Sequence, residues 1–170
     1  MTNKRITLLL IALGACARLV PHPWNFTPIL AIGLYAGVRS SKLWTAALVT
    51  MAAPLASDAL LGFYGGMWYV YAASLLPVLL GWIAQQRQTK VLGIVAAALA
   101  SSLGFFVVTN AAVWATGTLY PHTWTGLVTC FAAGVPFYRN QILGDAFYTC
   151  VLFGADALFR AALTPRPRVA

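Results

Sequence analysis

Acidic and charged residues are scarce in this chain. Its 170 residues include three Asp, no Glu and eleven Lys or Arg, so only 8% are charged. A soluble domain carries about 25% charged residues, and a water-facing surface needs them. Hydrophobic residues make up 61% of the chain, and its mean hydropathy is +0.79. This composition excludes a soluble domain and predicts an all-α, polytopic membrane helix bundle that forms one domain.

The sequence also lacks the motifs of common enzymes. There is no Walker A, HExxH or GxSxG motif, so neither ATP hydrolysis nor the usual hydrolytic chemistry is indicated. His22 and His122 lack metal-ligand spacing, and we expect no metal or other cofactor. Cys16, Cys130 and Cys150 lie in apolar segments without CxxC spacing, which favours packing over a disulfide framework. We therefore predict that this protein is not an enzyme.

The few cations follow a topological pattern. Pairs of them precede the first predicted span and separate the second from the third and the fourth from the fifth, and three follow the last. Cytoplasmic connections of membrane proteins carry an excess of Lys and Arg. The alternation therefore predicts about six transmembrane helices with both termini in the cytoplasm. Arg18 and Arg139 fall on the outer side and need another explanation. The nine cations explained by topology are Lys4, Arg5, Arg39, Lys42, Arg87, Lys90, Arg160, Arg166 and Arg168.

The predicted spans differ in length and in their small residues. The second contains Gly33 and Gly37 at a GxxxG spacing, which permits close helix approach. The fifth is the longest, and its small residues, including Ser101 and Gly104, lead us to expect it at the centre of the bundle. Proline and glycine interrupt residues 119–138, for which we predict a re-entrant or interfacial segment on the outer side. The six spans cover residues 6–20, 27–38, 43–62, 67–84, 91–116 and 141–159.

Charged side chains in or beside the spans are candidates for function, because they are costly in hydrocarbon. Arg18 and Asp58 are predicted at a similar outer depth, and so are Arg139 and Asp145. One interpretation is that these residues form structural ion pairs. The other is an outward-facing polar pocket, which Asn110 favours because its mid-span amide needs a partner. The sequence leaves both interpretations open.

The pocket interpretation adds aromatic residues to these polar groups. Trp114 follows Asn110 by four residues, and Tyr148 follows Asp145 by three, so each pair shares a helix face. Aromatic walls with a few polar groups are typical of a small-molecule site and would suit a flat heterocycle, although a lipid-facing aromatic belt would give the same pattern. The candidate substrate-binding residues are Arg18, Trp24, Asn25, Asp58, Trp68, Asn110, Trp114, His122, Arg139, Asn140, Asp145 and Tyr148, with Tyr71 as a further wall residue.

Four segments carry a resemblance to a known family. They are residues 17–28 (ARLVPHPWNFTP), 57–62 (SDALLG), 109–110 (TN) and 136–145 (PFYRNQILGD). Through them the chain resembles a bacterial family of uncharacterised membrane proteins, designated a domain of unknown function, with a suggested role in transport. That family in turn resembles the substrate-binding S components of energy-coupling factor (ECF) vitamin transporters.

The S-component resemblance implies a fold, a location and a partner. It implies six helices in the bacterial cytoplasmic (inner) membrane, with a ligand pocket near the outer face under the loop between the first two helices. It also implies a partner, an energy module of two ATPases and a membrane coupling subunit, toward which the S component topples. S components dock through an AxxxA face of the first helix, where this chain has Ala12 and Cys16. Metal-specific relatives carry His after the initiator Met, where this chain has Thr2, so nickel and cobalt are disfavoured.

Three hypotheses of function follow. The first is a substrate-binding transport protein that captures a small, vitamin-like or heterocyclic molecule from outside. The second is a structural or assembly protein that partners another membrane complex through its small-residue surfaces. An intramembrane enzyme ranks last. The expected surroundings are the lipid bilayer, and the dispersed cations do not form the basic patch that nucleic acid binding requires.

Overall fold

The computed structural model describes residues 4–163, which form seven helices and no strand. The helices are α1 (Lys4–Leu19), α2 (Ile29–Arg39), α3 (Leu43–Leu61), α4 (Met67–Ala73), α5 (Leu76–Gln86), α6 (Val91–Thr116) and α7 (Trp124–Leu163). Helices α4 and α5 are two parts of one apolar segment, Met67–Gln86. This segment, α3, α6 and α7 are long and apolar enough to cross a membrane, whereas α1 and α2 are shorter apolar helices. The predicted helical membrane bundle is confirmed.

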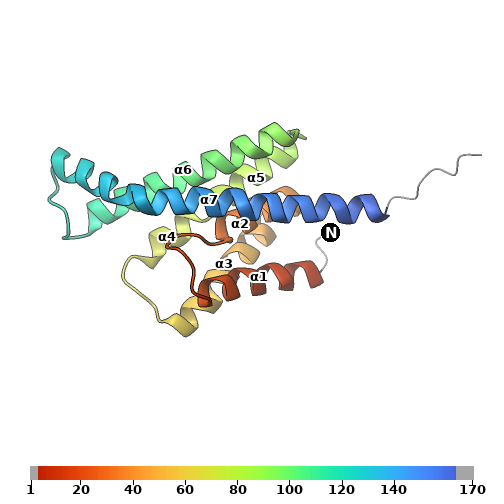
Figure 1. The fold of residues 1–170 in the computed structure, drawn as a ribbon, viewed down its shortest axis with the longest axis horizontal. Coiled ribbons are helices and arrows are strands. Elements are labelled where there is room, and N and C mark those ends of the chain that lie inside the picture. Colours follow the sequence, from red (N-terminus) through yellow and green to blue (C-terminus); the bar gives the residue numbers. More distant parts are fainter. Residues whose placement is uncertain (1–3, 164–170) are drawn as a thin grey trace, which may run out of the picture.

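Helix α2 forms the core of the bundle. Figure 1 shows α7 running along the whole molecule, with α2 behind its middle and α6 and α1 to either side. Helix α2 contacts α1, α3, α5, α6 and α7, and every residue of α2 from Ile29 to Val38 is buried. In α6 only Ser101 and Ser102 are buried. The central position predicted for residues 91–116 is therefore wrong, because a helix that is apolar on all sides can face lipid as well as protein.

Glycines bring α2 and α5 into close contact. A Cβ atom on Gly37 would lie 2.3 Å from the Val78 carbonyl oxygen, and one on Gly81 would lie 2.3 Å from the Leu34 carbonyl oxygen. Gly33 faces Pro77 and Val78 in the same interface. The GxxxG spacing thus serves packing inside the molecule, as small residues commonly do between membrane helices.

The last helix differs from its prediction. Helix α7 is continuous over 40 residues and contains Pro136, so residues 124–138 belong to it and do not form the separate re-entrant or interfacial segment expected at 119–138. Two glycines give α7 close contacts: a Cβ on Gly126 would meet the Pro121 carbonyl, and one on Gly134 would meet Asn110 of α6. Glycine and proline are tolerated in membrane helices where neighbouring groups form hydrogen bonds with the freed backbone N–H and C=O groups. At about 60 Å, α7 is twice the hydrocarbon thickness of about 30 Å.

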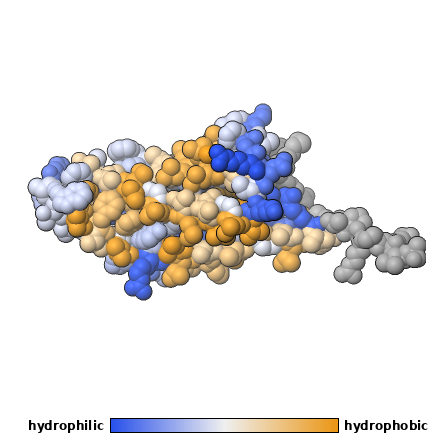
Figure 2. Space-filling view, turned by 90° about the horizontal axis from the view of Figure 1, so that it is seen from above, coloured by the Kyte–Doolittle hydropathy of each residue, from blue (hydrophilic) through white to orange (hydrophobic). Residues whose placement is uncertain are grey.

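Basic residues gather at one end of the bundle. The helix ends next to the basic connections meet at the right of Figure 1, and Figure 2 shows strongly hydrophilic groups there beside a hydrophobic middle. At this end Asp156 accepts hydrogen bonds from Arg39 (2.5 Å), Arg160 (2.9 Å) and the Tyr35 hydroxyl (3.1 Å), which ties α2 to α7. The described basic connections therefore lie at the same end of the helix bundle. The predicted location of the termini falls on residues 1–3 and 164–170, outside the described residues.

Candidate functional site

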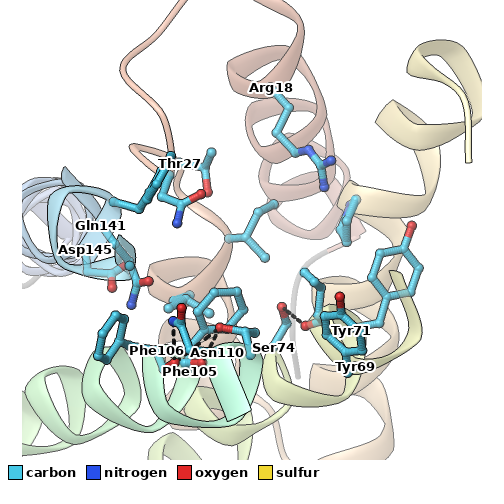
Figure 3. Close-up of a pocket in the computed structure, with 18 of the residues that line it drawn as sticks. Arg18, Thr27, Tyr69, Tyr71, Ser74, Phe105, Phe106, Asn110, Gln141 and Asp145 are labelled. Atoms are coloured by element: carbon cyan, nitrogen blue, oxygen red, sulfur yellow. Dashed lines mark hydrogen bonds between the residues drawn. The ribbon is translucent and has the colours of Figure 1, made fainter. Parts of the chain in front are cut away.

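A cavity of about 470 Å³ lies in the half of the bundle away from the basic end. The C-terminal end of α1, the loop of residues 20–28, α3, α4, α6 and α7 surround it (Figure 3). In the loop, Asn25 adopts a left-handed backbone conformation (φ 62°) that Asn tolerates better than most residues. The polar lining residues are Arg18, His22, Asn25, Thr27, Tyr64, Tyr69, Tyr71, Ser74, Thr109, Asn110, Gln141 and Asp145. The apolar lining residues include Leu30, Pro54, Phe105, Phe106, Val113 and Phe137.

One side of the cavity holds a buried ion pair. The Arg18 guanidinium donates to the Asp58 carboxylate, which is only 1% exposed, and the Tyr71 hydroxyl donates to the second oxygen of Asp58 at 2.5 Å. The predicted Arg18–Asp58 pair is therefore present. Nearby, partial burial and the Asp58 charge raise the pKa of the Tyr64 hydroxyl above its ordinary 10.0.

Helix α7 supplies two deeply buried polar groups of the cavity. Asp145 is 5% exposed, and its Oδ2 has no hydrogen-bond partner among the described residues. Gln141, one turn earlier on the same face, is 3% exposed. Its Nε2 donates to the carbonyl (2.7 Å) and the hydroxyl (3.0 Å) of Ser102 on α6. Figure 3 shows Gln141 and Asp145 side by side on α7. The wall thus contains one buried carboxylate that the protein leaves without a counter-ion.

Helix α6 lines the opposite part of the cavity with polar groups that bond to their own helix. The Asn110 Nδ2 donates to the Phe106 carbonyl at 2.8 Å, and the Thr109 hydroxyl donates to the Phe105 carbonyl at 2.8 Å. The partner that Asn110 was expected to need therefore lies on its own helix. Phe106 in turn stacks on Tyr138 of α7, with ring centroids 4.7 Å apart. The Tyr138 contact holds the Phe106 ring in this wall, and Phe105 lines the cavity beside it.

Of the predicted residues, Arg18, Asn25, Asn110 and Asp145 line the cavity, as does the wall residue Tyr71. Asp58 lies directly behind Arg18 and Tyr71.

Three predicted aromatic residues pack outside the lining. Trp24 is 73% exposed and its ring lies 5.6 Å from that of Phe137, while Trp68 is 64% exposed and lies 5.3 Å from Tyr69. The Tyr148 ring lies 5.7 Å from Phe26 in the loop. Since Phe137 and Tyr69 line the cavity, Trp24 and Trp68 support its walls from outside.

Two further predicted residues belong to the hairpin between α6 and α7. The Trp114 Nε1 donates to the Pro121 carbonyl at 3.0 Å, and the His122 ring lies 5.7 Å from the Trp114 ring. The His122 Nε2 also contacts the Gly117 carbonyl at 3.2 Å. The structure therefore places Trp114 and His122 in a local cap of this turn and not in the cavity.

The predicted Arg139–Asp145 pair is absent from the ion pairs of the described residues. Both residues lie on α7, six positions apart, which places them on different faces of one helix. Arg139 is exposed, and neither Arg139 nor Asn140 lines the cavity. The pairing was wrong because it rested on equal depth alone.

Several lining residues were missed by the sequence prediction. Gln141 could have been found, because it precedes Asp145 by four residues within an apolar helix. Tyr69, Ser74 and Phe106 carry no such signal, since their positions depend on how α4 and α6 pack. Among residues 4–163, no group of three or more His, Cys, Asp or Glu side chains could hold a metal ion.

The chain was compared with known protein families, curated proteins and solved structures. Residues 1–167 match the model of a family of unknown function, DUF6580, and the chain belongs to this family. No curated protein and no solved structure matches the chain.

Proposed function

We propose that this protein is a membrane-embedded, substrate-binding transport protein that captures a small, vitamin-like or heterocyclic molecule from the outer side for uptake. The observation that carries the proposal is the cavity of about 470 Å³ with aromatic walls and a few buried polar groups. Small-molecule sites have volumes of about 300–1,000 Å³ and this same mixture of groups. A bundle packed solid at this position would have argued against a ligand.

The position of the cavity supports capture from outside. It lies away from the end where the basic connections gather, and basic connections mark the cytoplasmic side of membrane proteins. The loop of residues 20–28 contributes His22, Asn25 and Thr27 to the lining. A loop can open and close more readily than a packed helix, so this one is the natural entrance for a ligand.

The proposal extends to an energy source. The chain has no Walker A motif, so uptake against a gradient requires a partner or a coupled ion. The resemblance to S components points to an ECF-type module of a coupling subunit and two ATPases in the bacterial inner membrane. In α1, Ala12 and Cys16 are both exposed and lie on one helix face. Cys16 stands where S components have the second Ala of the AxxxA motif, so this face departs from the usual docking surface.

A structural or assembly role receives less support. It was motivated by the GxxxG spacing, but Gly33 and Gly37 are covered by α5 inside the molecule. These glycines are therefore not available to another membrane protein.

Mass spectrometry of small molecules that copurify with the detergent-solubilised protein tests the proposal. We expect a bound compound in the wild type, and at least a tenfold lower yield from Asn110→Ala and Asp145→Ala, which alter two walls of the cavity. Asp156→Asn is the matched control, because it changes a carboxylate of α7 at the basic end and should retain the compound.

Two outcomes would contradict the proposed function. One is a wild-type protein that carries no compound and binds none from a library of vitamins and heterocycles. The other is a compound whose yield is the same in all three variants, which would place it outside the cavity.

A further inference from the structure

We propose that the cavity selects an organic cation, a small flat molecule whose protonated nitrogen pairs with the Asp145 carboxylate. This inference rests on the proposed function and adds the chemical class of its ligand. It is carried by the charge balance of the described residues, by the unpartnered oxygen of Asp145 and by the aromatic walls.

The charge balance singles out Asp145. Asp58 is paired with Arg18, and Asp156 is paired with Arg39 and Arg160. Asp145 has no ion pair to a described residue, unlike the other two Asp of the chain. It is also buried, with 5% of its surface exposed. A buried carboxylate is costly unless a cation or several hydrogen-bond donors satisfy it. A cationic ligand would supply the missing partner.

The Asp145 carboxylate belongs to the cavity wall, and its Oδ2 is buried there. Asp145 lines the cavity, and its Oδ2 has no hydrogen-bond partner among the described residues. The neighbouring donor groups are already engaged: the Gln141 Nε2 bonds to Ser102, and the Asn110 Nδ2 bonds to the Phe106 carbonyl. The Ser102 hydroxyl and the Gln141 amide lie beside the Asp145 carboxylate, but its Oδ2 is left without a donor among the described residues. An N–H group of the ligand fits this acceptor.

The walls suit a flat cation. Phe105 and Phe106 from α6, Phe137 from α7 and Tyr69 from α4 all line the cavity. Aromatic faces attract a cation that lies within about 6 Å of the ring centroid, and they stack against flat rings. A heterocycle with an amine or amidine group would use both properties.

An anionic ligand fits less well. Arg18 is the cation of the lining, and its guanidinium is already paired with Asp58, which also accepts from Tyr71. A carboxylate in the cavity would therefore compete with Asp58 for Arg18 and would face the uncompensated charge of Asp145. Like charges in such a site disfavour binding.

A panel of matched probes tests the inference. It contains tryptamine, benzamidine and 2-aminobenzimidazole, with indole-3-propionate, benzoate, 3-ethylindole and benzamide as acidic and neutral counterparts. Binding to the full chain in detergent is measured by thermal shift and by calorimetry. We expect at least one cation to bind ten times more tightly than its counterparts, and Asp145→Asn to remove this preference. Asp156→Asn should keep the preference, because Asp156 follows Asp145 by eleven residues on α7 and does not line the cavity.

A second variant keeps the test independent of whether Asp145→Asn folds. Asn110→Asp adds a carboxylate of the same shape across the cavity, and it should strengthen the preference for cations at least threefold. The inference is overturned if cations bind no better than their counterparts, or if Asp145→Asn and Asn110→Asp leave the ranking unchanged. If acidic or neutral probes bind in the cavity while cations do not, the proposed function stands and only the ligand class is wrong. If no probe binds and no compound copurifies, both proposals fail.

Discussion

At the scale of single residues, the buried charge of Asp58 depends on its partners. Asp58 is 1% exposed and is held by Arg18 and by the Tyr71 hydroxyl. Removing one member of a buried ion pair leaves the other charge unpaired, whereas replacing both by apolar groups can be neutral. The Arg18–Asp58 pair can therefore be tested for stability separately from ligand binding.

We predict that Asp58→Asn lowers the free energy of unfolding by about 3 kcal/mol, because the Arg18 guanidinium loses its counter-charge. Tyr71→Phe should cost about 1.5–2 kcal/mol, since it removes one hydrogen bond to a charged group. The double variant Arg18→Met with Asp58→Leu should recover most of the loss. Reversible unfolding in mixed detergent micelles measures all three. Equal losses in the single and double variants would show that the pair is not the source of the effect.

At the scale of helices, close backbone contact between α2 and α5 holds the core together. We predict that Gly37→Ala lowers the free energy of unfolding by about 3 kcal/mol, because its Cβ would lie 2.3 Å from the Val78 carbonyl oxygen. Backbone atoms cannot move aside as a flexible side chain can, so the two helices must separate. Thermal unfolding in detergent measures the change.

Gly154→Ala in α7 is the matched control for that prediction. No atom lies within 4 Å of a Cβ at this position, and alanine favours a helix over glycine by about 1 kcal/mol. The variant should be as stable as the wild type or slightly more so. A similar loss of stability at Gly37 and Gly154 would contradict the close contact between α2 and α5.

At the scale of the whole molecule, the gathering of basic residues at one end predicts how the protein sits in the bilayer. We expect a cysteine introduced at Thr118, in the turn between α6 and α7, to react with a membrane-impermeant maleimide added to intact cells. A cysteine at Gln86, next to the basic turn before α6, should react only after permeabilisation. Both positions are exposed, and both variants are made after Cys16, Cys130 and Cys150 are replaced by Ala. The opposite labelling pattern would invert the orientation and place the cavity toward the cytoplasm.

The sequence by itself determined the fold class and the common side of the basic connections. These features follow from local composition: apolar runs of sufficient length become helices, and the residues 91–116 predicted for one span are those of α6. It also identified the Arg18–Asp58 pair, because a charge in an apolar segment needs an oppositely charged partner and the chain has only three acidic residues.

The tertiary structure alone decided which helix is central and which polar residues share a cavity. Helix α2 is central because its glycines admit α5, a property of two helices that neither one reveals. Helix α7 is continuous through Pro136 and includes both Arg139 and Asp145, which therefore lie on different faces of one helix. Helix packing leaves Asp145 buried beside Gln141 and without an ion pair to a described residue. Local sequence specifies where a polar residue lies along its helix, whereas the packing of several helices decides what that residue faces.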